Sequence, residues 1–549
     1  MIRVPAASGE AKGVVLTNPG GPGQSGFDDL AYAGEYEVSK LALGEYDYVS
    51  FDPRGVDRSM GLQCYTDKEL DLTLMMDFTP DTEAEKKAMK DAGKIGDGCT
   101  GKFGDKVRHF STENTARDMD LMRESMGFKK IGFVGFSYGT YLGGVYATLF
   151  PNNVEAMVLD SAFDPAGDTP EEAALTQAVG FDESYKRFGE WCNNNSECTF
   201  TTKNFNADWL ALEKKLDEDS LVTKSGRFVN HEVLETATVK ALYSEDLWSR
   251  LANALRDARQ GKGAGLLALA DEYNGRDAQG RYSTSSNSRP IISCASGIVS
   301  KGSKNPAKML KTAKEKAPWY YRDAEKSWFE ESDCGKPYND AQLISLDYSG
   351  NAPIVVIGGE KDPATPFRWA EKMSKNLKGS VLVRYTEEGH TSVGTNRCTT
   401  KIARDVLTKG TLPASGVACS ADVPLTQPSW WSELLQNVPG TRYAGMSIGA
   451  SLGFPVEDFY SEFFVMNQDT DDARSLITKA LEDNGLANLT PDNDGLGDYI
   501  FFGNARIQQQ FFGVGFITEK DMKDLGFVAP SGFLPEGSTF AVLYTYPLD

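Results

Sequence analysis

Six short apolar segments, separated by stretches with helical character, constrain the fold of this chain more than any other feature. They lie at residues 12–18, 46–52, 130–136, 154–160, 352–359 and 380–386. Most of them are apolar throughout and do not alternate with polar residues, which is typical of strands buried on both faces of a parallel sheet. Between them lie stretches such as 111–127, where Ser111 or Thr112 can cap a helix. This alternation predicts an α/β fold with a mainly parallel sheet.

The alternation is interrupted between residues 165 and 345, a charged segment that favours helices. We interpret residues 165–345 as a helical cap inserted between two strands, so that 1–164 and 346–420 form the two parts of the α/β core. The composition changes again after Cys419, and the chain ends in the strand pattern STFAVLYTY. Residues 421–549 are therefore predicted to form a separate C-terminal α+β appendage, whose role the sequence does not indicate.

The charge and the apolar content of the chain limit the kinds of molecule that it can bind. The 549 residues include 57 basic and 78 acidic side chains, which give a net charge of −21. Such a surface repels nucleic acid and anionic lipid. No apolar run reaches the length of about 18 residues that predicts a membrane span. With three histidines and no CxxC motif, the sequence indicates neither a metal site nor another cofactor.

Eight cysteines in polar surroundings favour disulfide bonds and an oxidising compartment. Many connectivities are possible, and we expect the pairs that are neighbours along the chain: Cys64–Cys99, Cys192–Cys198, Cys294–Cys334 and Cys398–Cys419. The N-terminus shows no charged segment followed by an apolar one, so no signal peptide is visible. The cysteines nevertheless indicate a secreted or cell-surface protein.

A serine between two glycines follows the third apolar segment. The pentapeptide GFSYG at residues 135–139 matches the pattern G-x-S-x-G. The pattern is short and recurs by chance, but here it connects a predicted strand to a predicted helix. A nucleophilic serine in this position occupies a strained turn where larger neighbours would clash. Ser137 is therefore the candidate nucleophile, and an ordinary turn serine is the alternative.

A glycine-rich loop, NPGGPG at residues 18–23, directly follows the first apolar segment. Acyl transfer requires two N–H donors that stabilise the developing oxyanion. One comes from the residue after the nucleophile, here Tyr138, and we assign the other to Gly21 of this loop. A phosphate-binding loop is disfavoured because no Gly-Lys-Ser/Thr follows. A tight surface turn is the remaining alternative.

A nucleophilic serine also needs a general base. The chain contains three histidines: His109, His231 and His390. The order serine, acid, histidine along the chain selects His390, which follows the last predicted strand of the sheet. The acid is expected on a loop between them, and Asp362 follows the strand at 352–359, with Glu360 and Asp160 as alternatives. This acid would hold the imidazole tautomer and stabilise the imidazolium.

Together these motifs resemble the tripeptidyl aminopeptidase branch of the α/β-hydrolases, which is related to the proline iminopeptidases. The resemblance covers about residues 2–420 and lies in LTNPGGPGQSG, FDPRGVDRS, STENTARDMDLMRESMG, GFSYGTYLGGVYATLFP, VEAMVLDSAFDP, GGEKDPATP and EEGH. It implies an α/β-hydrolase fold and a secreted bacterial serine exopeptidase that releases short peptides, often tripeptides, from a free N-terminus. It also implies Ser137, Asp362 and His390 as a catalytic triad, and the Gly21 and Tyr138 N–H groups as an oxyanion hole.

Two features depart from this family. Its members carry an export signal and early strands before the glycine-rich loop, whereas this loop begins near the N-terminus. We therefore expect that the first edge strands of the sheet are missing and that IRVPAAS is the end of one. Residues 421–549 have no place in the family.

Several functions are compatible with these residues. For an exopeptidase, a counter-charge must bind the substrate ammonium group, and the cap offers candidate carboxylates: Glu171, Glu172, Asp182, Glu183 and Glu190. A carboxylesterase or lipase would use the same triad on esters. A catalytically inactive protein would bind its partners through residues 421–549. Epoxide hydrolases and dehalogenases are disfavoured because they carry aspartate in place of the serine.

Overall fold

The computed structural model describes residues 1–7, 9–74, 87, 98–166, 168–201, 203–299, 305–320, 334, 338 and 340–421. Beyond these it describes residues 441–448, 460–466, 470–483, 489–493, 498–502, 510–517 and 539–547. The chain divides into two compact units. The first comprises residues 1–34 and 43–420, and the second comprises residues 35–42 and 421–549.

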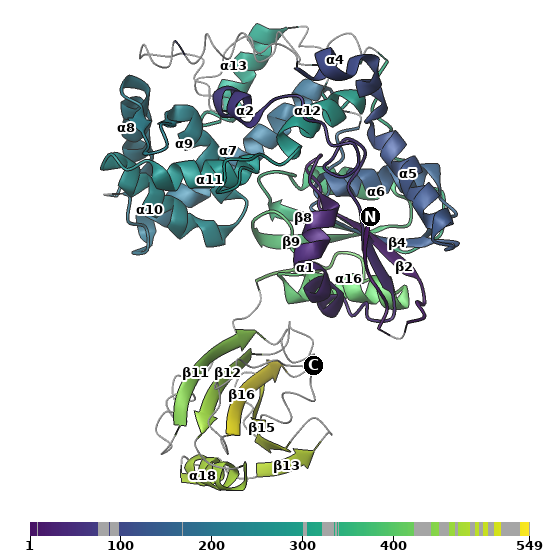
Figure 1. The fold of residues 1–549 in the computed structure, drawn as a ribbon, viewed down its shortest axis with the longest axis vertical. Coiled ribbons are helices and arrows are strands. Elements are labelled where there is room, and N and C mark those ends of the chain that lie inside the picture. The colour runs from purple at the N-terminus through teal and green to yellow at the C-terminus, as the bar shows by residue number, and fades with distance from the viewer. Residues whose placement is uncertain are drawn as a thin grey trace. The chain divides into compact units, whose positions relative to one another are not determined.

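A mainly parallel sheet forms the centre of the first unit (Figure 1). In the described residues it has eight strands in the order β1-β3-β2-β4-β5-β8-β9-β10. Their bounds are β1 (Ile2–Val4), β2 (Val14–Asn18), β3 (Asp47–Ser50), β4 (Ile131–Phe136), β5 (Val154–Asp160), β8 (Ile354–Lys361), β9 (Val381–Glu388) and β10 (Ala418–Cys419). Strand β1 runs antiparallel to β3, and the other neighbours are parallel. The predicted parallel sheet is thus confirmed, since each apolar segment overlaps one strand.

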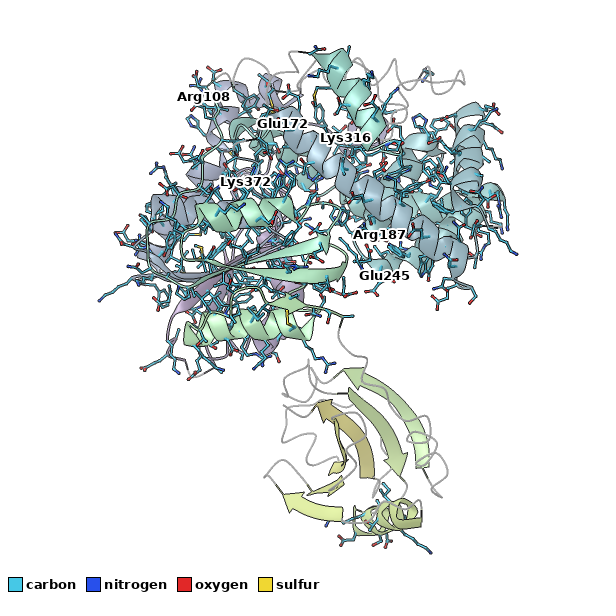
Figure 2. The ribbon with its side chains drawn as sticks, turned by 180° about the vertical axis from the view of Figure 1, so that it is seen from behind. Arg108, Glu172, Arg187, Glu245, Lys316 and Lys372 are labelled. Carbon is cyan, nitrogen blue, oxygen red and sulfur yellow. A yellow bond between two sulfur atoms is a disulfide. The ribbon has the colours of Figure 1, made fainter. Side chains whose placement is uncertain are left out.

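The continuous apolar pattern of these strands reflects burial on both faces. Every residue of β2 and β3 is buried. Helices α15 (Arg368–Asn376) and α16 (Arg397–Lys409) both pack on β8. Figure 2 shows them on opposite faces of the sheet, with Lys372 marking α15. Water is therefore excluded from both faces of these central strands, whereas β9 is only partly buried.

The remaining helices of the α/β core fill the connections between its first strands. They are α1 (Gly26–Lys40), α2 (Asp67–Thr73), α4 (Gly98–Phe103), the 3-10 helix η1 (Gly104–His109), α5 (Thr112–Ser125) and α6 (Tyr138–Leu149). Of the two caps considered for α5, the structure uses Ser111, whose side chain accepts a hydrogen bond from the Asn114 N–H at 3.3 Å.

A mainly helical segment lies between β5 and β8 and forms a second hydrophobic core with Phe188, Trp209 and Trp248. Its elements are α7 (Pro170–Asn194), α8 (Phe205–Glu218), the hairpin β6 (Leu221–Val222) and β7 (Phe228–Val229), α9 (His231–Leu242), η2 (Glu245–Leu247), α10 (Trp248–Arg259), α11 (Ala264–Asn274), α12 (Ser285–Ala295) and α13 (Pro306–Lys316). Helix α7 begins with a capping box, in which Thr169 and Glu172 each bind the other's backbone N–H. We call this segment the cap.

Residues 421–549 of the second unit combine an antiparallel sheet with one described helix. The described strands follow the order β11-β12-β16-β15-β14-β13. The bounds are β11 (Thr441–Ile448), β12 (Tyr460–Met466), α18 (Thr470–Asp483), β13 (Leu489–Asn493), β14 (Asp498–Phe502), β15 (Gln510–Ile517) and β16 (Thr539–Pro547). Ala473 and Ile477, one helical turn apart, are fully buried on the face of α18 that contacts β15 and β16. The strand expected from STFAVLYTY is β16.

All eight cysteines lie in the described residues and form the four expected disulfides, Cys64–Cys99, Cys192–Cys198, Cys294–Cys334 and Cys398–Cys419. Within the described ranges, no helix has both the length and the apolar content needed to cross a membrane. The same ranges contain no group of three or more acidic, histidine or cysteine side chains that could hold a metal ion.

Candidate active site

Ser137 occupies the turn between β4 and α6. Its φ of 55° and ψ of −126° lie outside the regions that residues with a side chain normally adopt. Its N–H donates to the Asp160 carbonyl oxygen at 3.0 Å, and the Thr140 N–H and hydroxyl donate to its carbonyl oxygen at 2.9 and 2.6 Å. These hydrogen bonds hold the backbone of Ser137 in its strained conformation. Strain of this kind concentrates at functional sites.

Glycines allow the backbone around this turn to pack closely. A Cβ on Gly139 would lie 2.5 Å from the Asn18 carbonyl oxygen, and a Cβ on Gly135 would lie 2.5 Å from the Gly139 carbonyl oxygen. A Cβ on Gly20 would lie 2.6 Å from the Phe136 carbonyl oxygen. The glycines of GFSYG and of the glycine-rich loop are therefore needed for the two segments to meet.

The two residues assigned to the oxyanion hole belong to these two segments. Tyr138 is the first residue of α6, where N–H groups have no acceptor within the helix. The loop turns sharply, with φ values of 101° at Gly20 and 110° at Gly21. A Cβ on Gly20 would lie 3.0 Å from the Ser137 Cβ and 3.3 Å from the Tyr138 nitrogen. The loop that carries Gly21 thus lies against the serine and the start of α6.

Asp362 and His390 come together where β8 and β9 end. The His390 Nδ1 lies 3.0 and 2.9 Å from the two carboxylate oxygens of Asp362, and the side chains are 8% and 0% exposed. The carboxylate also accepts hydrogen bonds from the N–H groups of Ala364 and Thr365 and from the Thr365 hydroxyl, at 2.8, 2.9 and 2.8 Å. When Nδ1 donates its proton to Asp362, Nε2 keeps the lone pair that a general base requires.

Glu360, the other acid considered on this segment, lines the same cavity but has a different partner. It forms an ion pair with Arg384, whose Nε is 2.7 Å from the Glu360 carboxylate. The structure therefore brings Asp362, and not Glu360, to His390. The third candidate, Asp160, has a different set of contacts.

Asp160, at the end of β5, connects the serine turn to the histidine loop. Its carbonyl oxygen accepts the Ser137 N–H, while its buried carboxylate accepts the N–H groups of Ser392 and Val393, both at 2.7 Å, and the Ser392 hydroxyl at 3.1 Å. Burial raises the pKa of Asp160, and the hydrogen bonds from Ser392 and Val393 oppose this shift. Asp160 therefore holds the segment that follows His390 beside the nucleophile turn.

The other two histidines have separate surroundings. His109 ends η1, and its carbonyl oxygen accepts a hydrogen bond from Arg54 at 2.9 Å. His231 begins α9 and lies 2.6 Å from Asp217 and 3.2 Å from Glu232. Burial acts to lower the pKa of His231, but these two carboxylates raise it to about 11. His231 is therefore protonated at neutral pH and is unsuited to the role of general base.

Tyr243 of the cap was not identified from the sequence. Its carbonyl oxygen accepts the His390 N–H at 2.9 Å. Its ring meets the His390 imidazole edge to face, with centroids 5.2 Å apart and an interplanar angle of 88°. Its contact with His390 joins the cap to the core, and a sequence pattern cannot reveal such a contact. The cap thus covers one side of the histidine.

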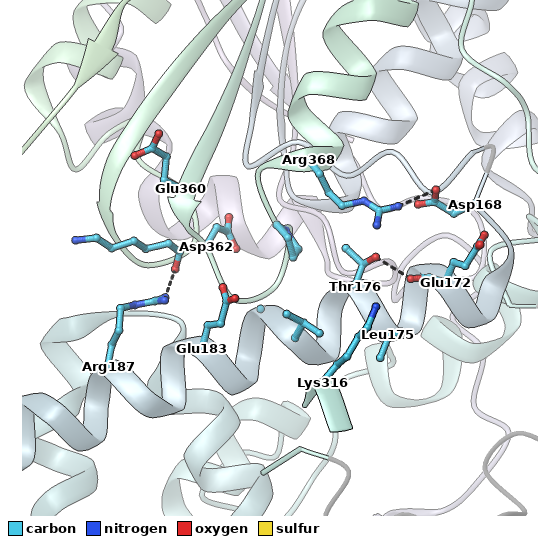
Figure 3. Close-up of a pocket in the computed structure, with 14 residues that line it drawn as sticks. Asp168, Glu172, Leu175, Thr176, Glu183, Arg187, Lys316, Glu360, Asp362 and Arg368 are labelled. Atoms are coloured by element: carbon cyan, nitrogen blue, oxygen red, sulfur yellow. Dashed lines mark hydrogen bonds and ion pairs between the residues drawn. The ribbon is translucent and has the colours of Figure 1, made fainter. Parts of the chain in front are cut away.

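A cavity of about 650 Å³ opens beside Asp362 (Figure 3). Helix α7 forms one wall with Glu172, Thr176 and Glu183, and the segment around Asp362 forms another. In Figure 3 Glu183 extends from α7 towards the segment that carries Asp362. The cavity therefore brings charged side chains of the cap next to Asp362, the acidic Glu172 and Glu183 together with the basic Arg187 and Lys316.

Comparison with known proteins identifies the family of this chain. The alpha/beta hydrolase fold family matches residues 13–396. Serine protease Hip1 of Mycobacterium tuberculosis (strain H37Rv) is 31% identical over 441 residues, which cover 76% of this chain and 83% of that protein. Tripeptidyl aminopeptidase of Streptomyces lividans is 29% identical over 437 residues, which cover 75% and 77%. Carboxylesterase B of the same Mycobacterium strain is 31% identical over 446 residues, which cover 76% and 82%.

The family match spans most of the chain, and these relatives are named as a serine protease, an aminopeptidase and an esterase. The sheet order and the serine turn at the end of β4 agree with the fold expected from the sequence motifs. The protein is a serine hydrolase, and the chain belongs to the alpha/beta hydrolase fold family.

Proposed function

We propose that this protein is a serine exopeptidase that releases short peptides, tripeptides among them, from substrates with a free N-terminus. The observation that supports this most directly is the buried Asp362–His390 pair, beside a cavity that carries acidic cap residues. The relative named tripeptidyl aminopeptidase supports the choice of peptide over ester. The four disulfides and the likeness to Hip1 are consistent with an extracellular protein, and we propose that it is secreted or held at the cell surface.

In the proposed mechanism, the His390 Nε2 removes the proton of the Ser137 hydroxyl as Oγ attacks the amide carbonyl carbon. The N–H groups of Gly21 and Tyr138 stabilise the oxyanion that forms. His390 then gives the proton to the leaving amine, and the C–N bond breaks. Water, deprotonated by His390, hydrolyses the acyl-enzyme and restores the serine. Asp362 holds the imidazole and stabilises its charged form throughout.

Glu183 is the cap carboxylate best placed to bind the substrate ammonium group. Glu172 also lines the cavity, but one of its oxygens accepts the Thr169 N–H in the capping box of α7. Asp182 accepts the Trp319 N–H at 2.6 Å and is buried in the cap. Among the described residues, Glu183 has no ion-pair partner and extends towards Asp362 (Figure 3). Its charge is therefore available to a ligand.

Matched peptides test this function. We expect cleavage of an alanine tripeptide coupled to aminocoumarin and little cleavage of its N-acetyl form, because acetylation removes the charge that Glu183 would bind. Glu183→Gln should raise KM for the free-amine peptide about tenfold, as expected for loss of one charge-assisted contact. Glu190→Gln, an exposed change on the same helix beside a separate cavity, is the matched control.

Cleavage of blocked peptides at the same rate as free-amine peptides would contradict the exopeptidase function. If free-amine peptides are preferred, product mass spectrometry on longer peptides shows how many residues are released.

The second candidate is a carboxylesterase, which the similarity to Carboxylesterase B favours. The same triad would then attack esters. Simple carboxylic esters that turn over much faster than any free-amine peptide would establish this alternative. An inactive binding protein would hydrolyse neither class of substrate.

A further inference from the structure

Arg289 is a half-buried cation in helix α12 of the cap. Among the described residues its guanidinium has no carboxylate partner, and its buried Nε has no hydrogen-bond partner. The guanidinium carbon lies over the ring of Tyr273, 5.8 Å from the ring centroid. A guanidinium held in this way can bind an incoming carboxylate without first breaking an internal ion pair, which makes it a candidate binding group.

The position of Arg289 places this charge near the reacting groups. A Cβ on Gly23 of the glycine-rich loop would lie 3.2 Å from the Arg289 backbone nitrogen and 2.5 Å from the Ser288 Oγ. Helix α12 therefore packs directly on the loop assigned to the oxyanion hole.

Two aromatic rings connect the guanidinium to the proposed base. The rings of Tyr273 and Tyr243 are 6.1 Å apart, and those of Tyr243 and His390 are 5.2 Å apart. Burial raises the pKa of Tyr243 well above its ordinary value, and the charge of Arg289 opposes this shift. Arg289 thus belongs to the surroundings of the site without contacting His390 itself.

The strand order separates Arg289 from the acidic cavity. In the sequence of neighbours β2-β4-β5-β8, the glycine-rich loop follows β2, Ser137 follows β4 and Asp362 follows β8. The loop and Asp362 therefore flank Ser137 on opposite sides. A peptide whose ammonium group lies in the cavity beside Asp362, and whose carbonyl lies at Ser137, directs its leaving group towards the loop and Arg289.

We propose that Arg289 binds a carboxylate on the leaving-group side of the scissile bond. The substrate class is thus a peptide that carries a carboxylate shortly after the bond, either the terminal carboxylate of a short peptide or an acidic side chain. The proposal rests on the proposed exopeptidase function for the direction of the peptide. It makes Arg289 a specificity-determining residue, since a guanidinium and a carboxylate form paired, charge-assisted hydrogen bonds.

The test compares full-length protein carrying Arg289→Met or Arg289→Lys with the unmodified enzyme. Arg250→Met is the matched control, because the Arg250 guanidinium pairs with Glu272 on the surface of the cap. The substrates are three free-amine peptides of the same length. One ends in a carboxylate, one in a carboxamide, and one in a carboxamide with glutamate directly after the scissile bond.

We expect the unmodified enzyme to cleave at least one carboxylate-bearing peptide with a kcat/KM about tenfold above that of the neutral carboxamide. Arg289→Met should abolish this preference, Arg289→Lys should keep part of it, and Arg250→Met should leave it unchanged. If the peptide with the terminal carboxylate is preferred, the terminal carboxylate is the ligand of Arg289. If the peptide with glutamate after the bond is preferred, the side-chain carboxylate is the ligand. An aminocoumarin tripeptide, which has a neutral leaving group, should lose less activity in Arg289→Met than the carboxylate-bearing peptides do.

Equal loss of activity on charged and neutral peptides would overturn the proposal, and so would an unmodified enzyme with no preference between them. If no peptide is cleaved at all, the exopeptidase function fails instead. Esters with a hydroxybenzoate or a hydroxybenzamide leaving group then test Arg289 on its own. Faster release of hydroxybenzoate that depends on Arg289 supports the carboxylate site, and equal release of the two overturns it.

Discussion

At the scale of single residues, Asp160 holds two distant parts of the site together. Its carbonyl oxygen accepts the Ser137 N–H, and its carboxylate accepts the N–H groups of Ser392 and Val393. The carboxylate is fully buried, so these donors have no access to water as a substitute partner. Asp160 is therefore a positioning residue for both the serine turn and the segment after His390.

We predict that Asp160→Ala lowers the free energy of unfolding by about 3 kcal/mol, because buried donors lose their acceptor. It should also lower kcat more than it raises KM, since His390 loses its fixed position. Asp160→Asn keeps one oxygen acceptor and should recover most of both losses. Urea unfolding and steady-state kinetics check this. An alanine variant with unchanged kcat would contradict the positioning role.

A second buried carboxyl, that of Asp164, makes stability depend on pH. Burial raises the pKa of Asp164 to about 6, and the Lys372 charge opposes this shift. Because an unfolded aspartate titrates near pH 3.9, the folded protein binds more protons between about pH 4 and pH 6. The stabilising contribution is therefore complete below about pH 4 and is lost as the pH rises through about 6.

We predict that Asp164→Asn removes this dependence, because the amide cannot lose a proton. Between pH 4 and pH 7, the free energy of unfolding of Asp164→Asn should rise by up to about 3 kcal/mol relative to that of the unmodified protein. The variant thus becomes more stable relative to the unmodified protein as the pH increases. Urea unfolding at both pH values measures the difference. A difference between the two proteins that does not change with pH would contradict the prediction.

The residues that could be predicted from the sequence are those that follow a strand within a recognisable motif. Ser137, Asp362 and His390 each follow an apolar strand, so the sheet predicts that they share one edge, and the structure brings Asp362 to His390. The contacts of Asp160 and Tyr243 could not be predicted in this way. They join the histidine loop to distant parts of the chain, and only the packed fold brings these groups together.

At the scale of elements, the site depends on how closely α6 approaches β2. Gly139 lies in the first turn of α6, and a Cβ there would lie 2.5 Å from the Asn18 carbonyl oxygen and 2.8 Å from its side-chain oxygen. A side chain at this position would force the helix away from the strand. The serine turn and the glycine-rich loop would then separate as well.

We predict that Gly139→Ala destabilises the protein by about 1–3 kcal/mol, which is typical of overpacking, and lowers kcat by disturbing the oxyanion hole. Gly101→Ala is the control, because Gly101 also lies in a helix and a Cβ there would have no neighbour within 4 Å. It should leave kcat unchanged and stabilise the protein slightly. Thermal unfolding of both variants checks the contrast, and equal effects would contradict it.

The strands of the core were easier to predict than the helices of the cap. Strands buried on both faces of a parallel sheet are largely apolar, and this pattern is visible in most of the six segments. The cap helices pack around a separate core whose residues are scattered along the chain, so their arrangement depends on tertiary contacts. The β6–β7 hairpin within the cap was not expected for this reason.

At the scale of the whole molecule, disulfides add constraints to loops of very different length. Cys294 and Cys334 are 40 positions apart, whereas Cys192 and Cys198 are 6 positions apart. A longer closed loop removes more conformational entropy from the unfolded chain. The first bridge is therefore expected to stabilise the protein more than the second.

We predict that replacing both cysteines of the Cys294–Cys334 bridge by serine lowers the free energy of unfolding by about 4 kcal/mol, against about 2 kcal/mol for the Cys192–Cys198 bridge. Guanidinium unfolding of the two double variants under non-reducing conditions gives the comparison. A larger loss of unfolding free energy for the Cys192–Cys198 variant would contradict the prediction. It would show that native contacts, and not chain entropy, determine how much each disulfide stabilises the protein.

The central claim is that Ser137, activated by His390 and Asp362, carries out the hydrolysis. Reaction with a fluorophosphonate, followed by peptide mass spectrometry, tests it most directly. We predict one adduct per chain, located on Ser137, and none on Ser137→Ala when circular dichroism shows that variant to be folded. Asp362→Asn should react on the order of 10⁴-fold more slowly, because the imidazole is held in the wrong tautomer. An adduct on another residue, or no adduct on the folded protein, would contradict the claim.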